Sequence, residues 1–154
     1  MAKRLFLRLD YCIGCHACEA ACRSRFAGEA RVRYAEVNET VLLPMSCRHC
    51  AEPLCAAACP FEVIVKTENG VVQQASFHCV GCRSCALACP FGVIDTSMLR
   101  RIAQKCSLCA DRPEGPRCVA TCPTGALTFV EEKEVAETVV GVGFAGRHGH
   151  WRRP

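Results

Sequence analysis

The residues of this chain that could do chemistry are its cysteines, which make up sixteen of the 154 residues. At this content, cysteine chemistry rather than ordinary packing sets the fold. The cysteines form four groups, namely Cys12, Cys15, Cys18 and Cys22; Cys47, Cys50, Cys55 and Cys59; Cys79, Cys82, Cys85 and Cys89; and Cys106, Cys109, Cys118 and Cys122. Disulfide bonds, zinc sites and iron–sulfur clusters all use cysteines in such numbers.

Disulfide bonds would require an oxidising compartment. The N-terminal segment MAKRLFLRLDY has neither an apolar stretch of secretory length nor a small-residue cleavage site. No run approaches the roughly 18 uninterrupted apolar residues of a membrane span. The best candidate, residues 135–145, is short and is interrupted by Glu137 and by glycines. We therefore expect a cytoplasmic protein without a membrane span, in which the cysteines bind metal.

The spacing within the groups favours iron–sulfur clusters over zinc. Zinc ribbons and fingers use two separated pairs of ligands around a tetrahedral ion. Here three cysteines lie together and a fourth follows after three residues, as in the bacterial ferredoxin run C-x2-C-x2-C-x3-C-P, whose fourth cysteine ligates the other cluster of a pair. The second group widens one gap to four residues and the fourth group widens one to eight. A structural zinc-binding scaffold is the alternative.

Short elements must position these cysteines. Two-residue gaps let a tight loop aim three thiolates at one cube, while the fourth cysteine lies on a short helix and reaches a neighbouring cube. Proline follows the last three groups, as Pro60, Pro90 and Pro123, where it stops the helix and begins an extended segment. The unit of cluster loop, helical turn and apolar strand therefore recurs three times. Arg23 replaces the proline after the first group, so we expect that helix to continue through residues 23–26.

Several segments read as strands. Residues 3–9 alternate in polarity and are well placed to pair with the β-rich run 126–131. Residues 63–66 and 71–73 flank a turn that ends in Asn-Gly, which predicts a hairpin. Residues 34–43 also read as extended, and helices of one to two turns should follow the third cysteine of each group. The expected fold class is α+β, with short helices and β-hairpins around clusters that form most of the core.

The four groups resemble the four-cluster ferredoxin-type iron–sulfur subunits of large redox complexes. Relatives in that family serve dimethyl sulfoxide reductases, formate dehydrogenases, hydrogenases, carbon monoxide dehydrogenases and tungsten aldehyde oxidoreductases. The resemblance covers about residues 3–131 and includes both widened gaps. It implies two nested, pseudo-symmetric bacterial 2[4Fe–4S] ferredoxin-like units: an outer one of residues 1–35 and 99–134, and an inner one of residues 36–98. Residues 135–154 would be a C-terminal tail and a docking segment.

The resemblance also implies which cysteines share a cluster, and it pairs the first group with the fourth and the second with the third. The implied ligand sets are Cys12, Cys15, Cys18 and Cys122; Cys106, Cys109, Cys118 and Cys22; Cys47, Cys50, Cys55 and Cys89; and Cys79, Cys82, Cys85 and Cys59. No ligand is missing, so we expect four [4Fe–4S] clusters.

The residues outside the clusters point away from catalysis. All sixteen cysteines are used as ligands, so neither a nucleophilic thiol nor an open iron position is left, and the chain has no dinucleotide-binding or P-loop motif. Three histidines adjoin cysteines, namely His16, His49 and His78. We interpret them as loop residues that are solvated or donate a hydrogen bond to a cluster sulfur. We expect no catalytic residue and a chain that only conducts electrons.

Charge and tail composition bear on partners. Four cations lie in or beside cluster loops, Arg48, Arg83, Lys105 and Arg117, and each could raise a local reduction potential or be a solvated surface charge. The formal charge of +4 falls to about −4 once four oxidised clusters of about −2 each are counted, so a nucleic-acid partner is not indicated. The apolar, glycine-rich run 139–144 and the later Trp151 and arginines have the composition of an interface.

The leading hypothesis is a non-catalytic electron-transfer subunit of a soluble oxidoreductase complex. It would relay electrons between a large catalytic subunit, of the tungsten or molybdenum aldehyde oxidoreductase type, and a flavin subunit or external acceptor. The alternatives are a freely diffusing polyferredoxin, or the iron–sulfur subunit of a hydrogenase, formate dehydrogenase or carbon monoxide dehydrogenase complex. Self-association into a longer wire is also open.

Overall fold

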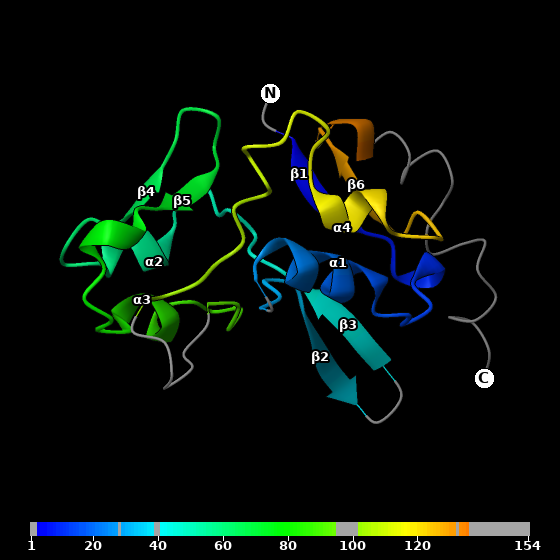
Figure 1. Cartoon of the computed structure of the whole chain (residues 1–154), viewed down its shortest axis with the longest axis horizontal. Helices are drawn as coiled ribbons and strands as arrows, with labels where there is room; N and C mark the ends of the chain where they lie inside the picture. The colour runs from blue at the N-terminus through cyan, green and yellow to red at the C-terminus, as the bar shows by residue number, and fades with distance from the viewer. Residues whose placement is uncertain (1–2, 28, 39–40, 95–101, 132, 136–154) are drawn as a thin grey trace.

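The first and last strands of the chain pair with each other. In the computed structural model, which describes residues 3–27, 29–38, 41–94, 102–131 and 133–135, β1 (Arg4–Leu7) lies antiparallel to β6 (Leu127–Val130). The Arg8 N–H extends the ladder by donating to the Ala126 carbonyl at 2.8 Å. The predicted pairing of residues 3–9 with residues 126–131 is thus confirmed, and it brings the two ends of the described chain together (Figure 1).

Four helices carry the cysteine groups: α1 (Ala17–Arg25), α2 (Leu54–Ala57), α3 (Ser84–Leu87) and α4 (Arg117–Ala120). Each begins one residue before the third cysteine of its group, rather than after it as expected. The helix α1 has nine residues where the others have four, because Arg23 stands where the other groups have a proline. The predicted extension past residue 23 is confirmed, and it ends at Phe26, whose N–H donates to the Cys22 carbonyl.

Two further hairpins complete the sheets. β4 (Ile64–Lys66) and β5 (Val72–Gln74) form the predicted hairpin, in which Gly70 closes the turn with φ of +75°. β2 (Arg33–Asn38) and β3 (Val41–Met45) form a second antiparallel hairpin, with a register shift between Glu36 and Asn38. The extended run predicted over residues 34–43 is therefore two strands. Short 3-10 helices span Leu9–Tyr11 and Ser76–His78.

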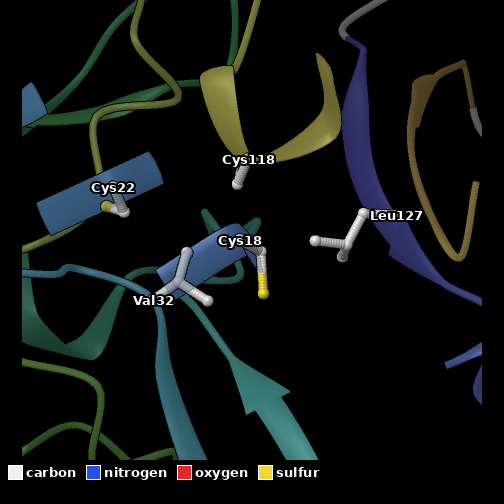
Figure 2. Close-up of a cluster of buried hydrophobic side chains, with 5 residues drawn as sticks. All are labelled: Cys18, Cys22, Val32, Cys118 and Leu127. Carbon is white, nitrogen blue, oxygen red and sulfur yellow. The ribbon is translucent and has the colours of Figure 1, made fainter. Parts of the chain in front are cut away.

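The elements gather in two groups (Figure 1). α1 lies beside α4 and the β1–β6 sheet, while α2 lies beside α3 and the β4–β5 hairpin. Each group has its own small core, and cysteine side chains belong to both: Cys18, Cys22 and Cys118 in the first (Figure 2) and Cys85 in the second. These short helices and two-stranded antiparallel sheets make an α+β fold. Among the residues that the structure describes, no helix has the length and apolar character needed to cross a membrane.

Candidate iron–sulfur cluster sites

All sixteen cysteines lie in the described ranges, and all are free thiols. Twelve of them line three separate hollows, four to each. We name these site 1 (Cys12, Cys15, Cys18, Cys122), site 3 (Cys47, Cys50, Cys55, Cys89) and site 4 (Cys59, Cys79, Cys82, Cys85). Each hollow therefore takes three cysteines from one group in the sequence and one from another group. These are the same sets that the family resemblance implied.

The remaining four cysteines, Cys22, Cys106, Cys109 and Cys118, make up site 2. Burial, together with the nearby thiolates of Cys106, Cys22 and Cys109, raises the pKa of Cys118 to about 12. The same three cysteines act on Arg31: burial lowers the pKa of its guanidinium, and their negative charge opposes that effect. Figure 2 shows Cys22 on α1 and Cys118 on α4 converging on one core. The structure thus brings the fourth predicted set together as well.

The shape of these sites fits a multi-atom cluster better than a single ion. Around one zinc ion, four sulfurs at about 2.3 Å from the metal would pack against each other and leave no hollow. Sites 1, 4 and 3 are instead open hollows with about 280, 350 and 480 Å³ of space between their lining atoms, a volume that includes open solvent. Within the described residues, no group of three His, Cys, Asp or Glu side chains is arranged to hold a single metal ion. Four thiolates around a wider space are the ligand set of a [4Fe–4S] cluster.

The cluster loops share a backbone turn that aims their sulfurs inward. In all four loops, the residue directly before the second cysteine has a positive φ: Gly14 (+65°), His49 (+47°), Gly81 (+74°) and Leu108 (+56°). Glycine adopts this left-handed conformation without strain, whereas His49 and Leu108 hold it while fully buried. The turn therefore recurs in all four groups, although glycine marks it in the sequence of only two.

Backbone and side-chain donors point at several of the sulfurs. The N–H groups of Arg31, Val63 and Leu108 donate to Cys22, Cys59 and Cys106 at 3.1, 3.4 and 3.4 Å. The Tyr34 hydroxyl lies 3.6 Å from the Cys18 sulfur. Hydrogen bonds to a thiolate favour its charged form and are one of the means by which a protein sets a cluster potential.

Tyr34 and His49 are two contributions that the sequence pattern did not reveal. Tyr34 comes from β2, accepts the His16 N–H at 3.2 Å and stacks on the His16 ring. His49 accepts the Val72 N–H at its Nδ1 atom at 3.0 Å. Burial, together with the positive charges of Lys105 and Arg4, lowers the pKa of His49 to about 3, so this imidazole is neutral.

His49 therefore differs from the expectation of a solvated or sulfur-bound residue, because its buried ring supports the backbone of β5. His78 is exposed, as expected for a solvated residue. His16 bonds Glu19 through Nδ1 at 2.9 Å.

The four cations singled out in the sequence occupy different environments. Arg48 lines site 3, with its guanidinium 5.7 Å from the centre of the Phe91 ring, and Arg83 lines site 4. Arg117 opens α4 and is half-buried. Lys105 differs from all of these because it is buried, with 3% of its surface exposed. Arg31 is a fifth cation at the sites, half-buried and stacked 3.6 Å over the Phe26 ring.

The sites form a row. Site 1 adjoins site 2, because the Cys18 thiolate raises the pKa of buried Cys118 and both side chains lie in one core (Figure 2). Site 2 adjoins site 3, because Cys47 is among the thiolates that act on Cys106, whose pKa burial raises to about 12. Sites 3 and 4 share α2 and α3, since each of these helices carries the third cysteine of one site and is followed by a cysteine of the other.

The two ends of this row reach the surface. Two cysteines are exposed, Cys15 at site 1 and Cys82 at site 4. Exposed apolar side chains lie beside them: Ile13, 67% exposed, lines site 1, and Val80, 60% exposed, lines site 4. Sites 2 and 3 have no exposed cysteine. The row thus runs from one exposed sulfur to another through two sites whose cysteines are buried or half-buried.

Comparison with known proteins identifies iron–sulfur domains in this chain. Two family models described as 4Fe–4S dicluster domains match residues 11–63 and 38–132. The chain is 31% identical to a subunit of the sulfite dehydrogenase of Allochromatium vinosum, over 97% of this chain and 77% of that protein. It is 35% identical to the thiosulfate reductase electron transfer subunit PhsB of Salmonella typhi, over 83% of this chain and 76% of that protein.

A third relative is much longer. The chain is 38% identical, over 84% of its length, to the putative oxidoreductase UacF of Escherichia coli, but it spans only 21% of that protein. Two dicluster domains imply four [4Fe–4S] clusters, which is the number that sixteen cysteines can hold with four ligands each. The predicted resemblance and cofactor are thereby confirmed.

Proposed function

Because the chain belongs to the family of 4Fe–4S dicluster iron–sulfur proteins, we propose that it relays electrons along four clusters between a catalytic subunit and a second redox partner. It is an iron–sulfur electron-transfer subunit of an oxidoreductase complex and transforms no substrate itself. The observation that carries the proposal is the row of four sulfur-lined sites with an exposed cysteine at each end.

Each of sites 1 to 4 holds one [4Fe–4S] cluster through its four cysteines. The shared hollows of sites 1, 3 and 4 and the electrostatic contacts within site 2 support these ligand sets. A bound cluster of this type accepts and releases electrons without binding a substrate. The buried thiols of Cys106 and Cys118 have raised pKa values, so they must give up protons when they bind iron.

The two units are nested, with residues 1–35 and 99–134 forming the outer unit around an inner unit of residues 36–98. The pairing of β1 with β6 and the contact of α1 with α4 support the outer unit. The contact of α2 with α3 and the β4–β5 hairpin support the inner one. The β2–β3 hairpin straddles the boundary at residue 36 and places Pro44 and Tyr34 against site 1.

Partners dock at the two ends of the row. The exposed sulfur and apolar rim of site 1, and those of site 4, are the surfaces across which electrons would enter and leave. One partner is a large catalytic subunit carrying tungsten or molybdenum, and the other is a flavin subunit or an external acceptor. The proposed docking tail, residues 135–154, lies outside the described residues except for its first residue. Self-association through the two ends would extend the row.

The test is anaerobic purification of the chain from its own cells with a small affinity tag, followed by metal analysis and electron paramagnetic resonance (EPR). We expect about sixteen irons per chain, because sixteen cysteines hold four [4Fe–4S] clusters at four ligands each and every cluster contains four irons. We also expect a co-purifying subunit that carries tungsten or molybdenum. Sixteen irons without any partner would favour a freely diffusing polyferredoxin. Zinc in place of iron would contradict both.

A further inference from the structure

Lys105 is a buried cation at the junction of sites 2 and 3. It directly precedes Cys106 of site 2 in the chain. Its ammonium group donates to the carbonyl oxygen of Cys106 at 3.2 Å and to that of Val72. Val72 lines the hollow of site 3. One side chain therefore bridges the backbone of site 2 and the wall of site 3, while 3% of its surface is exposed.

The residue that holds the ammonium group is itself held by a second side chain. The Val72 N–H donates to the neutral His49 imidazole, and the Val72 carbonyl accepts from Lys105. Val72 is itself only 1% exposed, so these hydrogen bonds lie in the protein interior. The local charge comes from the ammonium group, which the structure fixes rather than leaves to move with solvent.

The negative groups that face Lys105 belong to both neighbouring sites. Cys106 of site 2 directly follows it in the chain, and Cys55 of site 3 lines the same hollow as its acceptor Val72. The two acceptors of its hydrogen bonds are neutral carbonyls. An ammonium taken out of water loses much hydration, and nearby opposite charge is what offsets that loss. Electron density added to either site would be attracted to the same fixed charge.

We propose that Lys105 sets the reduction potentials of sites 2 and 3 together, raising both, so that an electron crosses the junction between a matched pair of central clusters. This inference rests on the proposed function, because it takes clusters to be bound at these sites. Lys105 acts as a positioning charge and touches no substrate. Its effect on sites 1 and 4 is small, since the ends of the row lie one site further away on either side.

The test is an EPR-monitored redox titration of the full, iron-loaded chain carrying Lys105→Gln. Glutamine removes the charge but keeps an N–H donor for the Val72 carbonyl. We expect two of the four midpoint potentials to fall by about 59 mV each. For a one-electron couple, this shift corresponds to about a tenfold change in the reduction equilibrium. The other two should stay within error of the wild-type values. Lys105→Arg keeps the charge and should retain all four potentials.

Lys66→Gln is the matched control. Lys66 also donates to a backbone carbonyl, that of Ala51 beside site 3, at 2.6 Å, but it is exposed to solvent. Water and salt should screen its charge, so its removal should leave the potentials in place. An equal shift in Lys66→Gln would mean that any nearby positive charge suffices, and it would overturn the specific role of Lys105.

The other outcomes separate this inference from the proposed function. A wild-type chain without iron would overturn both. If the wild-type chain holds four clusters, the result for Lys105→Gln tests the inference alone. A shift of no potential, of only one potential or of all four potentials would overturn it. Loss of clusters from Lys105→Gln, when Lys105→Arg retains them, would assign Lys105 to structure rather than to the potentials and would likewise overturn it.

Discussion

Tyr34→Phe should lower the reduction potential of site 1 and leave the other three sites unchanged. The Tyr34 hydroxyl lies 3.6 Å from the Cys18 sulfur. A cluster-bound thiolate can only accept a hydrogen bond, so Tyr34 is the donor there. The hydroxyl also accepts the His16 N–H, which orients its proton toward the sulfur. Phenylalanine keeps the ring against His16 and removes the hydroxyl, which is both the donor to the sulfur and the acceptor of the exposed His16 N–H.

The magnitude follows from the worth of one hydrogen bond. A typical hydrogen bond contributes about 0.5–1.5 kcal/mol net. A tenfold change in a one-electron equilibrium corresponds to about 59 mV, or about 1.4 kcal/mol. If the bond acts only when the cluster is reduced, its loss lowers the potential by about 20–60 mV. Because the bond also exists in the oxidised state, the smaller end of this range is the expected shift.

The assay is an EPR-monitored redox titration of the loaded chain, with Thr67→Val as the control. Thr67 loses a hydroxyl of the same kind, but one that donates to the Val71 carbonyl in the β4–β5 turn at 3.0 Å. That variant should lose stability without moving any potential. The reasoning would be refuted if Tyr34→Phe leaves the site 1 potential unchanged, or if it shifts all four potentials alike.

Three further predictions test the ligand sets, the loops and the linked protons. Cys122→Ser should alter the same EPR signal as Cys15→Ser, because both cysteines belong to site 1, whereas Cys109→Ser in site 2 should alter a different one. If Cys122→Ser and Cys109→Ser alter the same signal, the assignment of Cys122 to the site of the first cysteine group is wrong. Gly14→Ala should lower thermal stability by about 1–2 kcal/mol, from its φ of +65° alone, since no atom lies within 4 Å of the added Cβ. Because burial raises the pKa of the Cys118 thiol to about 12 from an ordinary 9.0, cluster binding releases a proton below that pH. A chelator, corrected for its own pH dependence, should therefore strip iron more readily at pH 6.5 than at pH 8.5, and equal loss would refute the linkage.

Local signals in the sequence predicted the elements that hold the cysteines. The Asn-Gly pair forecast the hairpin β4–β5, and Arg23 in place of a proline forecast the longer helix α1. Both depend on neighbours within a few residues. In the widened groups, Pro53 and Pro116 precede α2 and α4, whereas left-handed His16 and Arg83 precede α1 and α3. The loop spacing thus changes how each helix starts, a detail that the cysteine pattern alone did not reveal.

Contacts between distant segments could not be read in this way. Tyr34 reaches Cys18 only because the β2–β3 hairpin folds back over site 1, and residues 34–43 read only as extended. His49 and Lys105 meet Val72 from loops that belong to different groups. The sequence singled out both only by their place beside cysteines, since nothing local marks a side chain that will bond a peptide more than twenty residues away.

The helices themselves link neighbouring sites. In every group the third and fourth cysteines are four residues apart. On α1 both lie on the helix, where side chains at this spacing are about 5–6 Å apart. In the other three groups the helix ends two residues before the fourth cysteine. The third cysteine belongs to one site and the fourth to the next, as Cys18 and Cys22 on α1 illustrate in Figure 2. A short segment from the third to the fourth cysteine therefore links site 1 to site 2 and site 3 to site 4. The spacing within each of these two pairs of sites therefore depends on local backbone geometry. Sites 2 and 3 share no such segment, so at the junction beside Lys105 the chain relies on contacts between residues that are distant in the sequence.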